Sequence, residues 1–136
     1  MFVVRALPSG PSCTIVRKGE RRGCPVRVLI EVNVSAEATK SGVPHGRVQD
    51  LLDRLAERRW LVVDGLMAVP PRGPAESVRP HFRALRELRD SLRSDAPANA
   101  PLRELSMGMS DDFSVAIEEG ATMVRIGRAI FGERDA

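Results

Sequence analysis

The chain has 136 residues, of which 43% are hydrophobic and 29% charged, and its formal net charge is +3. This size and composition are typical of one globular domain, and no apolar run reaches the roughly 18 residues that a membrane span requires. Basic and acidic residues interleave, Tyr is absent and Trp occurs once, which favours solvated helix faces over a nucleic-acid surface. We therefore expect a cytoplasmic protein that binds neither nucleic acid nor membranes.

The first 26 residues show no sustained helical or strand period. They contain three prolines, three glycines and a cluster of four basic residues between positions 17 and 22. We predict that residues 1–26 are irregular. The two cysteines, Cys13 and Cys24, match no zinc-binding spacing, so we expect free thiols and no metal site.

From residue 27 onward, apolar runs alternate with amphipathic patterns. Four runs are typical of buried parallel strands: residues 28–34, 61–69, 102–107 and 122–126. Helices are predicted between them, near residues 48–55, 80–92 and 110–119. Ser110 is a suitable N-cap for the third helix, and Gly120 a suitable C-terminal cap. This order predicts a parallel α/β sheet with right-handed crossovers.

The length limits which parallel α/β fold can form. A complete (β/α)8 TIM-type barrel needs about 200 residues or more, whereas this chain has room for four βα units. The pattern alone fits either a piece of such a barrel or a small open sheet. An open half-barrel would expose apolar strand edges, so we expect self-association or marginal stability.

Candidate ligand-binding residues lie in the loops that follow the third and fourth predicted strands. Ser106 and Ser110 offer hydroxyl groups, while Gly108 and Gly127 allow close approach of backbone N–H groups, a combination that suits a phosphate. The two aspartates after Ser110 would repel an anion placed on their helix, so a phosphate is expected at the glycine loops and the Gly127 helix start. Ordinary turn glycines and an N-cap serine explain the same residues.

Arg125 is a sharper signal, because it lies inside an otherwise apolar predicted strand. A buried arginine is costly unless it has a partner. Either an acid such as Glu31 or Asp64, or an acceptor on a ligand, would provide that partner.

Three segments resemble successive parts of the pyridoxal phosphate homeostasis family, which is similar to the N-terminal barrel domain of alanine racemase. They read LIEVNVSAEATKSGV, VDGLMAV and LSMGMSDDFSVAIEEGATMVRIGRAIFG. The resemblance covers about residues 27–135 and implies a partial (β/α)8 barrel over residues 27–136, the C-terminal half of the complete one. The cofactor it implies is pyridoxal 5'-phosphate (PLP). The implied phosphate cradle consists of Ser106, the backbone of Met107, Gly108, Met109 and Ser110, and Gly127. Arg125 is implied to face the pyridine nitrogen.

The departures from the family concern the lysine that binds PLP as a Schiff base. The barrel strand that provides this lysine has no counterpart here, and the chain contains only Lys18 and Lys40. Lys40 matches a different lysine of the family, in a loop, where we favour the simpler explanation of a solvated charge. We therefore expect weak, non-covalent PLP binding in a truncated protein of intracellular PLP homeostasis that has no catalytic residues.

Two other functions stay open. An alanine-racemase-like enzyme would need a Schiff-base lysine and an opposed general base, and the absence of Tyr removes the tyrosine base of alanine racemases. A non-functional structural remnant is the third possibility. The expected partners are PLP and, for the open barrel, either a second copy or a separate N-terminal half.

Overall fold

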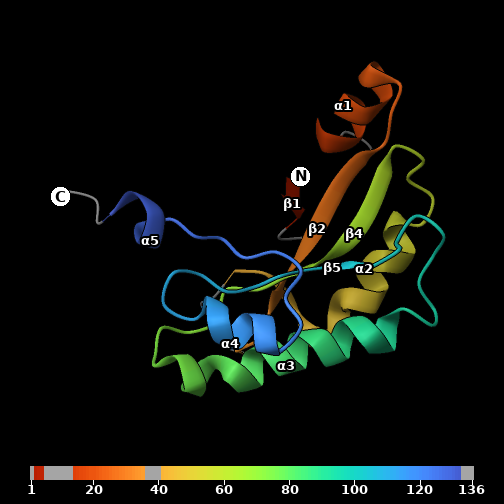
Figure 1. The fold of residues 1–136 in the computed structure, drawn as a ribbon. Coiled ribbons are helices and arrows are strands. Elements are labelled where there is room, and N and C mark those ends of the chain that lie inside the picture. Colours follow the sequence, from red (N-terminus) through yellow and green to blue (C-terminus); the bar gives the residue numbers. More distant parts are fainter. Residues whose placement is uncertain (1, 5–13, 36–40, 133–136) are drawn as a thin grey trace.

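The computed structural model describes residues 2–4, 14–35 and 41–132. Strands and helices alternate along this part of the chain (Figure 1). The elements are β1 (Phe2–Val4), α1 (Thr14–Arg22), β2 (Val26–Asn33), β3 (Val43–Pro44), η1 (His45–Arg47), α2 (Val48–Leu55), β4 (Leu61–Met67), α3 (Ala75–Leu92), β5 (Glu104–Ser106), α4 (Phe113–Glu118) and α5 (Arg128–Phe131). None of the described helices is long and apolar enough to cross a membrane.

The strands form a parallel sheet in the order β1-β2-β4-β5, and β3 pairs with the end of β2. Helices α2 and α3 lie along one side of this sheet, and α4 lies beside α3 (Figure 1). Helices α2 and α3 each connect one parallel strand to the next, as the sequence pattern predicts. The predicted fold class, an α/β partial barrel, is therefore confirmed.

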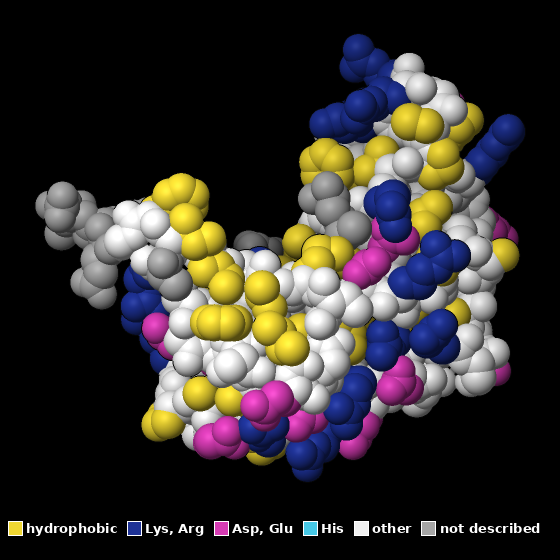
Figure 2. Space-filling view, in the orientation of Figure 1, with side chains coloured by type: hydrophobic (Ala, Val, Ile, Leu, Met, Phe, Trp, Pro, Cys, Tyr) yellow, Lys and Arg dark blue, Asp and Glu magenta, His cyan; other side chains and the backbone are white. Residues whose placement is uncertain are grey.

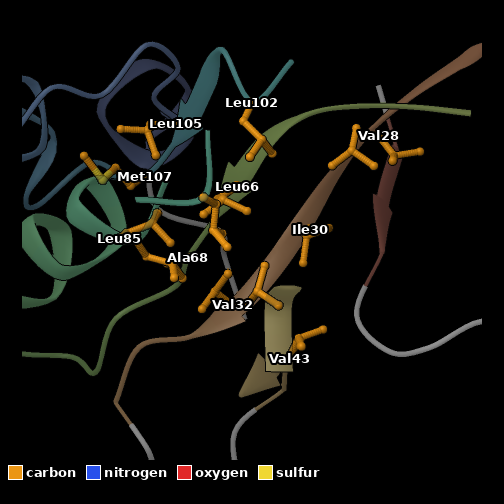
Figure 3. Close-up of a cluster of buried hydrophobic side chains, with 14 of the residues drawn as sticks. Val28, Ile30, Val32, Val43, Leu66, Ala68, Leu85, Leu102, Leu105 and Met107 are labelled. Atoms are coloured by element: carbon orange, nitrogen blue, oxygen red, sulfur yellow. The ribbon is translucent and has the colours of Figure 1, made fainter. Parts of the chain in front are cut away.

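The hydrophobic core lies between the sheet and the helices that cover it (Figure 3). Val28, Ile30 and Val32 of β2 point into this core together with Leu66 of β4 and Leu85 of α3, and each is at most 1% exposed. Because strand side chains alternate between faces, the intervening residues of β2 point to the opposite face of the sheet. Glu31, one of these intervening residues, acts through its charge on Arg125 of the site described below.

The N-terminal segment corrects the prediction that residues 1–26 are irregular. Strand β1 pairs in parallel with β2, with Val3 opposite Leu29, and residues 14–22 form α1. Gly19 allows α1 to lie close to the start of β4, because a Cβ at this position would lie 2.7 Å from the carbonyl oxygen of Trp60. The sequence argument counted this glycine as a breaker, whereas tertiary packing uses it as a contact.

The fourth predicted strand, residues 122–126, is the second correction. Only one bridge forms there, between Ser106 and Met123, although the backbone N–H groups of Thr122 and Met123 both donate to the Leu105 carbonyl oxygen. Strand β5 is likewise shorter than predicted. No described strand pairs with the far side of residues 122–126, so this segment lacks the second ladder that would make it a regular strand.

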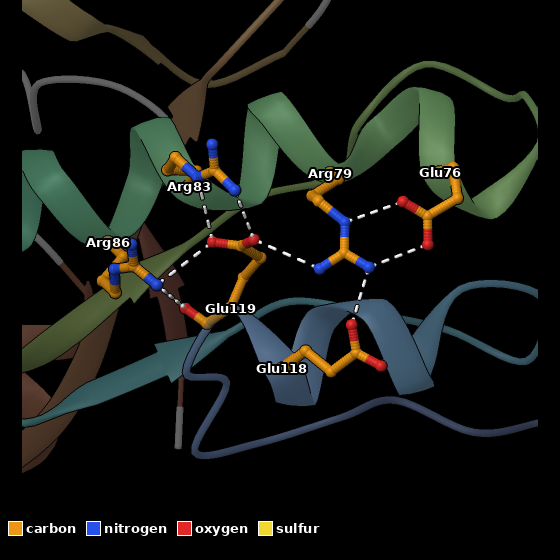
Figure 4. Close-up of polar contacts among 6 residues, drawn as sticks. All are labelled: Glu76, Arg79, Arg83, Arg86, Glu118 and Glu119. Atoms are coloured by element: carbon orange, nitrogen blue, oxygen red, sulfur yellow. Dashed lines mark hydrogen bonds and ion pairs between the residues drawn. The ribbon is translucent and has the colours of Figure 1, made fainter.

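Helix α4 is fixed to α3 by the carboxylate of Glu119, which is 5% exposed (Figure 4). Its oxygens accept hydrogen bonds from Arg79 Nη1 at 3.2 Å, Arg83 Nη2 at 3.0 Å and Arg86 Nη1 at 3.1 Å. The bonds from Arg83 and Arg79 lower the pKa of Glu119, although burial opposes this shift. Gly120 follows with a φ of +94°, which confirms it as the C-terminal cap.

Candidate functional site

The carboxyl ends of the parallel strands meet at one edge of the sheet, where their loops surround a hollow of about 940 Å³. The lining comes from residues 70–73 after β4, residues 109–112 after β5, and Arg125 with the start and end of α5. Hydrophobic side chains gather over α5 in Figure 2, where Phe131 is 84% exposed. This is the edge at which parallel α/β folds bind their ligands.

Arg125 is held by the backbone at this edge. Its Nη2 donates to the carbonyl oxygen of Ala68 at 2.8 Å, and its own backbone N–H donates to the carbonyl oxygen of Gly108 at 2.9 Å. Burial lowers the pKa of the Arg125 guanidinium, while the charges of Glu31 and Asp112 oppose the shift. Arg125 Nε is buried and has no acceptor among the described residues, and Arg125 is one of the residues that line the hollow.

The two acids considered as partners of Arg125 have different roles. Asp64 is 1% exposed and forms an ion pair with Arg27, away from Arg125. Glu31 is buried at the end of β2, accepts a hydrogen bond from Ser41 Oγ at 2.9 Å, and acts on Arg125 through its charge. The hydrogen-bond partner of Arg125 is therefore a main-chain carbonyl rather than either acid.

Ser106 and Met107, two of the predicted cradle residues, are buried and do not line the hollow. The Ser106 carbonyl oxygen accepts a hydrogen bond from Ala68 N–H at 3.1 Å, and Met107 N–H donates to the Met123 carbonyl oxygen at 3.1 Å. Both residues thus fix the loop to its neighbours. Their backbone positions the residues that follow them at the hollow.

Gly108 turns the loop with a φ of +94°, and a Cβ there would lie 2.6 Å from Ala116 Cβ. Packing against α4 is enough to require this glycine. Met109 and Ser110 then line the hollow. Phe113 N–H donates to the Met109 carbonyl oxygen at 2.9 Å, but α4 begins at Phe113 with Asp112 as its N-cap, so Ser110, the predicted N-cap, lies in the turn before the helix.

The carboxylate of Asp112 completes this helix start. Its Oδ1 accepts the Met109 N–H at 2.6 Å, while Asp112 N–H donates to the Met109 carbonyl oxygen at 3.1 Å. These two bonds close a turn over residues 109–112 immediately before α4, whose N-cap is Asp112. The Met109 N–H is consequently already used within the loop.

Gly127 lies at the start of α5 and lines the hollow, and its φ of −118° requires no glycine. No described atom lies within 4 Å of a Cβ built there, so the residue leaves open space beside the helix start. The first N–H groups of any helix have no intrahelical acceptor. Beside them, Arg128 Nη2 forms an ion pair with Asp111.

Sequence reasoning missed several residues of the hollow, among them Arg72, Arg128 and Phe131. Arg72 follows two prolines in the loop after β4, and such loops have no periodicity that singles out one side chain. The position of this loop directly after a predicted strand was the only signal in the sequence. The aromatic ring of Phe131 lies at the other end of the lining.

Lys18 and Cys24, the lysine and the cysteine that the structure describes, do not line this hollow. Lys18 lies on α1, before β2 begins, with its Nζ 4.7 Å from the ring centroid of Phe2. Cys24 is an exposed free thiol, whereas Lys40 and Cys13 lie outside the described residues. Within the described part of the chain, no group of three or more His, Cys, Asp or Glu could hold a metal ion.

Sequence comparison relates this chain to one family. The profile of the family "Alanine racemase, N-terminal domain" matches residues 13–135. The pyridoxal phosphate homeostasis protein of Aquifex aeolicus is 55% identical over 109 residues, which cover 79% of this chain and 46% of that protein. The Vibrio alginolyticus protein of the same name is 45% identical over 112 residues, covering 82% and 47%. The chain spans about half the length of the curated relatives it matches.

Structural comparison gives the same relationship. PipY of Synechococcus elongatus without PLP has a TM-score of 0.78 and 30% identity, covering 88% of this chain and 55% of that one. PipY with PLP bound has a TM-score of 0.74 and 29% identity, covering 86% and 54%. Alanine racemase from Corynebacterium glutamicum, at 20% identity and a TM-score of 0.63, shares the fold. This chain therefore belongs to the alanine racemase N-terminal domain family, and its resemblance to the pyridoxal phosphate homeostasis proteins is confirmed.

Proposed function

We propose that this chain binds PLP without a covalent bond and takes part in intracellular PLP homeostasis rather than in catalysis. The observation that carries the proposal is Arg125, which is fixed by two backbone contacts and keeps its buried Nε unsatisfied beside the hollow. The relatives described above are named for PLP homeostasis, and PipY was solved with PLP bound. Bound PLP supplies an electrophilic aldehyde and an electron-withdrawing pyridine ring.

In this proposal, Arg125 recognises the ring. Its Nε would donate a hydrogen bond to the pyridine nitrogen, and a guanidinium keeps its charge under ordinary conditions. A permanent cation at that position disfavours protonation of the pyridine nitrogen, which makes the ring a weaker electron sink than one paired with a carboxylate. A weak electron sink suits a protein that stores or transfers the cofactor.

The phosphate of PLP would lie near Ser110 and the Gly127 helix start, which also line the hollow. Ser106, Met107 and Gly108 would shape this cradle indirectly, through the buried loop that they form. Met109 would contribute its exposed side chain to the lining, because its N–H is already bonded to Asp112. Open space beside Gly127 and helix N–H groups without intrahelical acceptors both suit an anion.

Two features of the lysines support the non-covalent character, namely the position of Lys18 and the sequence around Lys40. Lys18 on α1 points to the Phe2 ring at the opposite end of the strands, far from Arg125 along the fold. Lys40, in the loop after β2, carries no feature in the sequence that predicts an activated amine. Without an attached lysine and a tyrosine base, the residues of the hollow can bind and orient a cofactor but provide no proton transfer at an amino-acid substrate.

Equilibrium binding of PLP, followed by absorbance and by dialysis, tests the proposal. Arg125→Ala should weaken binding by about tenfold or more, since a hydrogen bond to a charged group contributes roughly 1.5–3 kcal/mol. The matched control is Arg54→Ala, which removes an exposed arginine on α2 and should leave PLP affinity unchanged. Equal affinity of the wild type and Arg125→Ala would contradict the ring assignment.

Two further outcomes bear on covalency and catalysis. A stoichiometric adduct that borohydride traps on one lysine would show that attachment is covalent. Measurable racemisation of an amino acid by the purified chain would overturn the conclusion that it is not an enzyme.

A further inference from the structure

The hollow contains three arginines and two aspartates, which leaves it with a formal net charge of +1. Arg128 is paired with Asp111 in an ion pair. Arg125 is half-buried, donates to a backbone carbonyl and lies in the field of Asp112 and Glu31. Arg72 differs from both, because it forms no ion pair with any acid in the described part of the chain. The uncompensated positive charge of the hollow is therefore that of Arg72.

The backbone that supports Arg72 is well fixed. Pro70 and Pro71 precede it, and their rings restrict the backbone on its N-terminal side. On the other side, Pro74 is the N-cap of α3, and its carbonyl oxygen accepts hydrogen bonds from Ser77 N–H at 2.9 Å and Ser77 Oγ at 2.7 Å. The Arg72 side chain is exposed, but its backbone is held where the loop after β4 borders the hollow.

We infer that Arg72 is the residue that selects phosphorylated ligands at this site, by pairing with a phosphomonoester dianion. The inference rests on the proposed function and assigns a residue to it outside the glycine loops. A phosphomonoester has a charge of about −1.5 to −2 at neutral pH. Without Arg72 the hollow would be formally neutral and would offer such an anion no net attraction, whereas an unphosphorylated vitamer needs no cation.

In this inference, Arg125 recognises the ring of the ligand and Arg72 recognises its phosphate. Arg125 is restrained and only partly exposed, which suits a single directed hydrogen bond to a ring atom. Arg72 can move at its tip, which suits the three equivalent oxygens of a phosphate and the bidentate contact that a guanidinium makes with them. Arg128 already forms an ion pair with Asp111 and is therefore the weaker candidate for the phosphate contact.

The test compares PLP with pyridoxal, which lacks the phosphate, in the wild type and in Arg72→Gln. We expect Arg72→Gln to weaken PLP binding about tenfold, since an Arg–phosphate contact is charge-assisted, and to leave pyridoxal binding unchanged. Arg72→Lys keeps the charge and should retain most of the PLP affinity. Arg54→Gln is the matched control on α2. Added salt should weaken PLP binding to the wild type more than to Arg72→Gln.

The outcomes separate this inference from the proposed function. If the wild type and Arg72→Gln bind PLP equally, the Arg72 assignment fails while PLP binding stands. An equal loss of PLP and pyridoxal would show that Arg72 acts on the ring or on the fold, and would overturn the assignment. If the wild type binds neither ligand, the proposed function fails and the inference fails with it.

Discussion

Gly65 is the position at which one added methyl group should disrupt the sheet that supports the site. A Cβ there would lie 1.9 Å from the carbonyl oxygen of Glu104 and 2.6 Å from its carbonyl carbon. Both are backbone atoms of β5, so no side chain can rotate away, and Gly65→Ala must push β4 and β5 apart. These strands are in register at three pairs, including Leu66 with Leu105, and both leucines are fully buried.

The expected cost follows from what strand separation exposes. A few ladder hydrogen bonds at about 0.5–1.5 kcal/mol each, together with partial exposure of a leucine at about 1.5–3 kcal/mol in full, give on the order of 3 kcal/mol or more. Domains of this kind have a total stability of about 5–15 kcal/mol. Gly65→Ala should therefore lower the free energy of unfolding substantially and also weaken PLP binding, because β5 leads directly into the 106–112 loop.

Urea denaturation followed by circular dichroism measures this effect. The matched control is Gly46→Ala, because no described atom lies within 4 Å of a Cβ at that position and its φ is not in the left-handed region. That variant should stay within about 0.5 kcal/mol of the wild type. A Gly65→Ala protein with the wild-type denaturation midpoint would refute the close-approach argument.

Two further predictions concern acid stability and association. Because the pKa of Glu119 is lowered from 4.5, its contribution to stability is present above about pH 4.5 and is lost as pH falls through the folded pKa. Glu119→Gln should thus lower the melting temperature of the protein at neutral pH and approach that of the wild type in acid. Glu57→Gln, which removes an exposed acid, should not change the melting temperature at either pH. An equal difference between Glu119→Gln and the wild type at both pH values would contradict this. The exposed Phe2 and Phe131 flank the two ends of the open sheet, so sedimentation should show concentration-dependent association, and a monodisperse, cooperatively melting monomer would count against it.

The elements that the sequence predicted correctly are those with a strong apolar period. The run at 28–34 became β2 at Val26–Asn33, and the helix near 48–55 has the predicted bounds. Strand β2 is buried on both faces and α2 on one, so each sequence pattern directly reflects the packing of its element. The bulge of β4, where Val28 pairs with Val63 and Leu29 with Gly65, left no such trace in the sequence.

The failures have tertiary causes. Strand β1 is too short for a period to be visible, and only its pairing with β2 makes it a strand. Helix α1 has a glycine in its middle and a β-branched start at residues 14–16, which both argue against a helix locally. Residues 122–126 have strong strand propensity but obtain only one bridge, so local preference without a second neighbour was not enough.

For the site, the sequence was informative where a residue conflicts with its surroundings. Arg125 was identified because a charge in an apolar run needs an explanation, and the structure places it at the hollow with an unsatisfied Nε. Ser106 and Gly108 were identified by residue type, and their described contacts are explained by loop packing. An arginine is an ordinary residue in an exposed loop, so nothing in the sequence singles out Arg72. Only the arrangement of charged side chains around the hollow distinguishes it from other arginines.

The 106–112 loop obtains its conformation from contacts within this chain, and this determines what half of a barrel can do. Met107 N–H bonds to Met123, Gly108 accepts from Arg125, and Met109 is closed by Asp112. None of these contacts requires another barrel strand, so the loop and the arginine are preorganised together. Preorganised contacts bind a ligand without a large ordering cost, whereas an open edge excludes little water. Under the proposed function, this preorganised arrangement of the loop and Arg125 suits specific recognition of the PLP ring and phosphate.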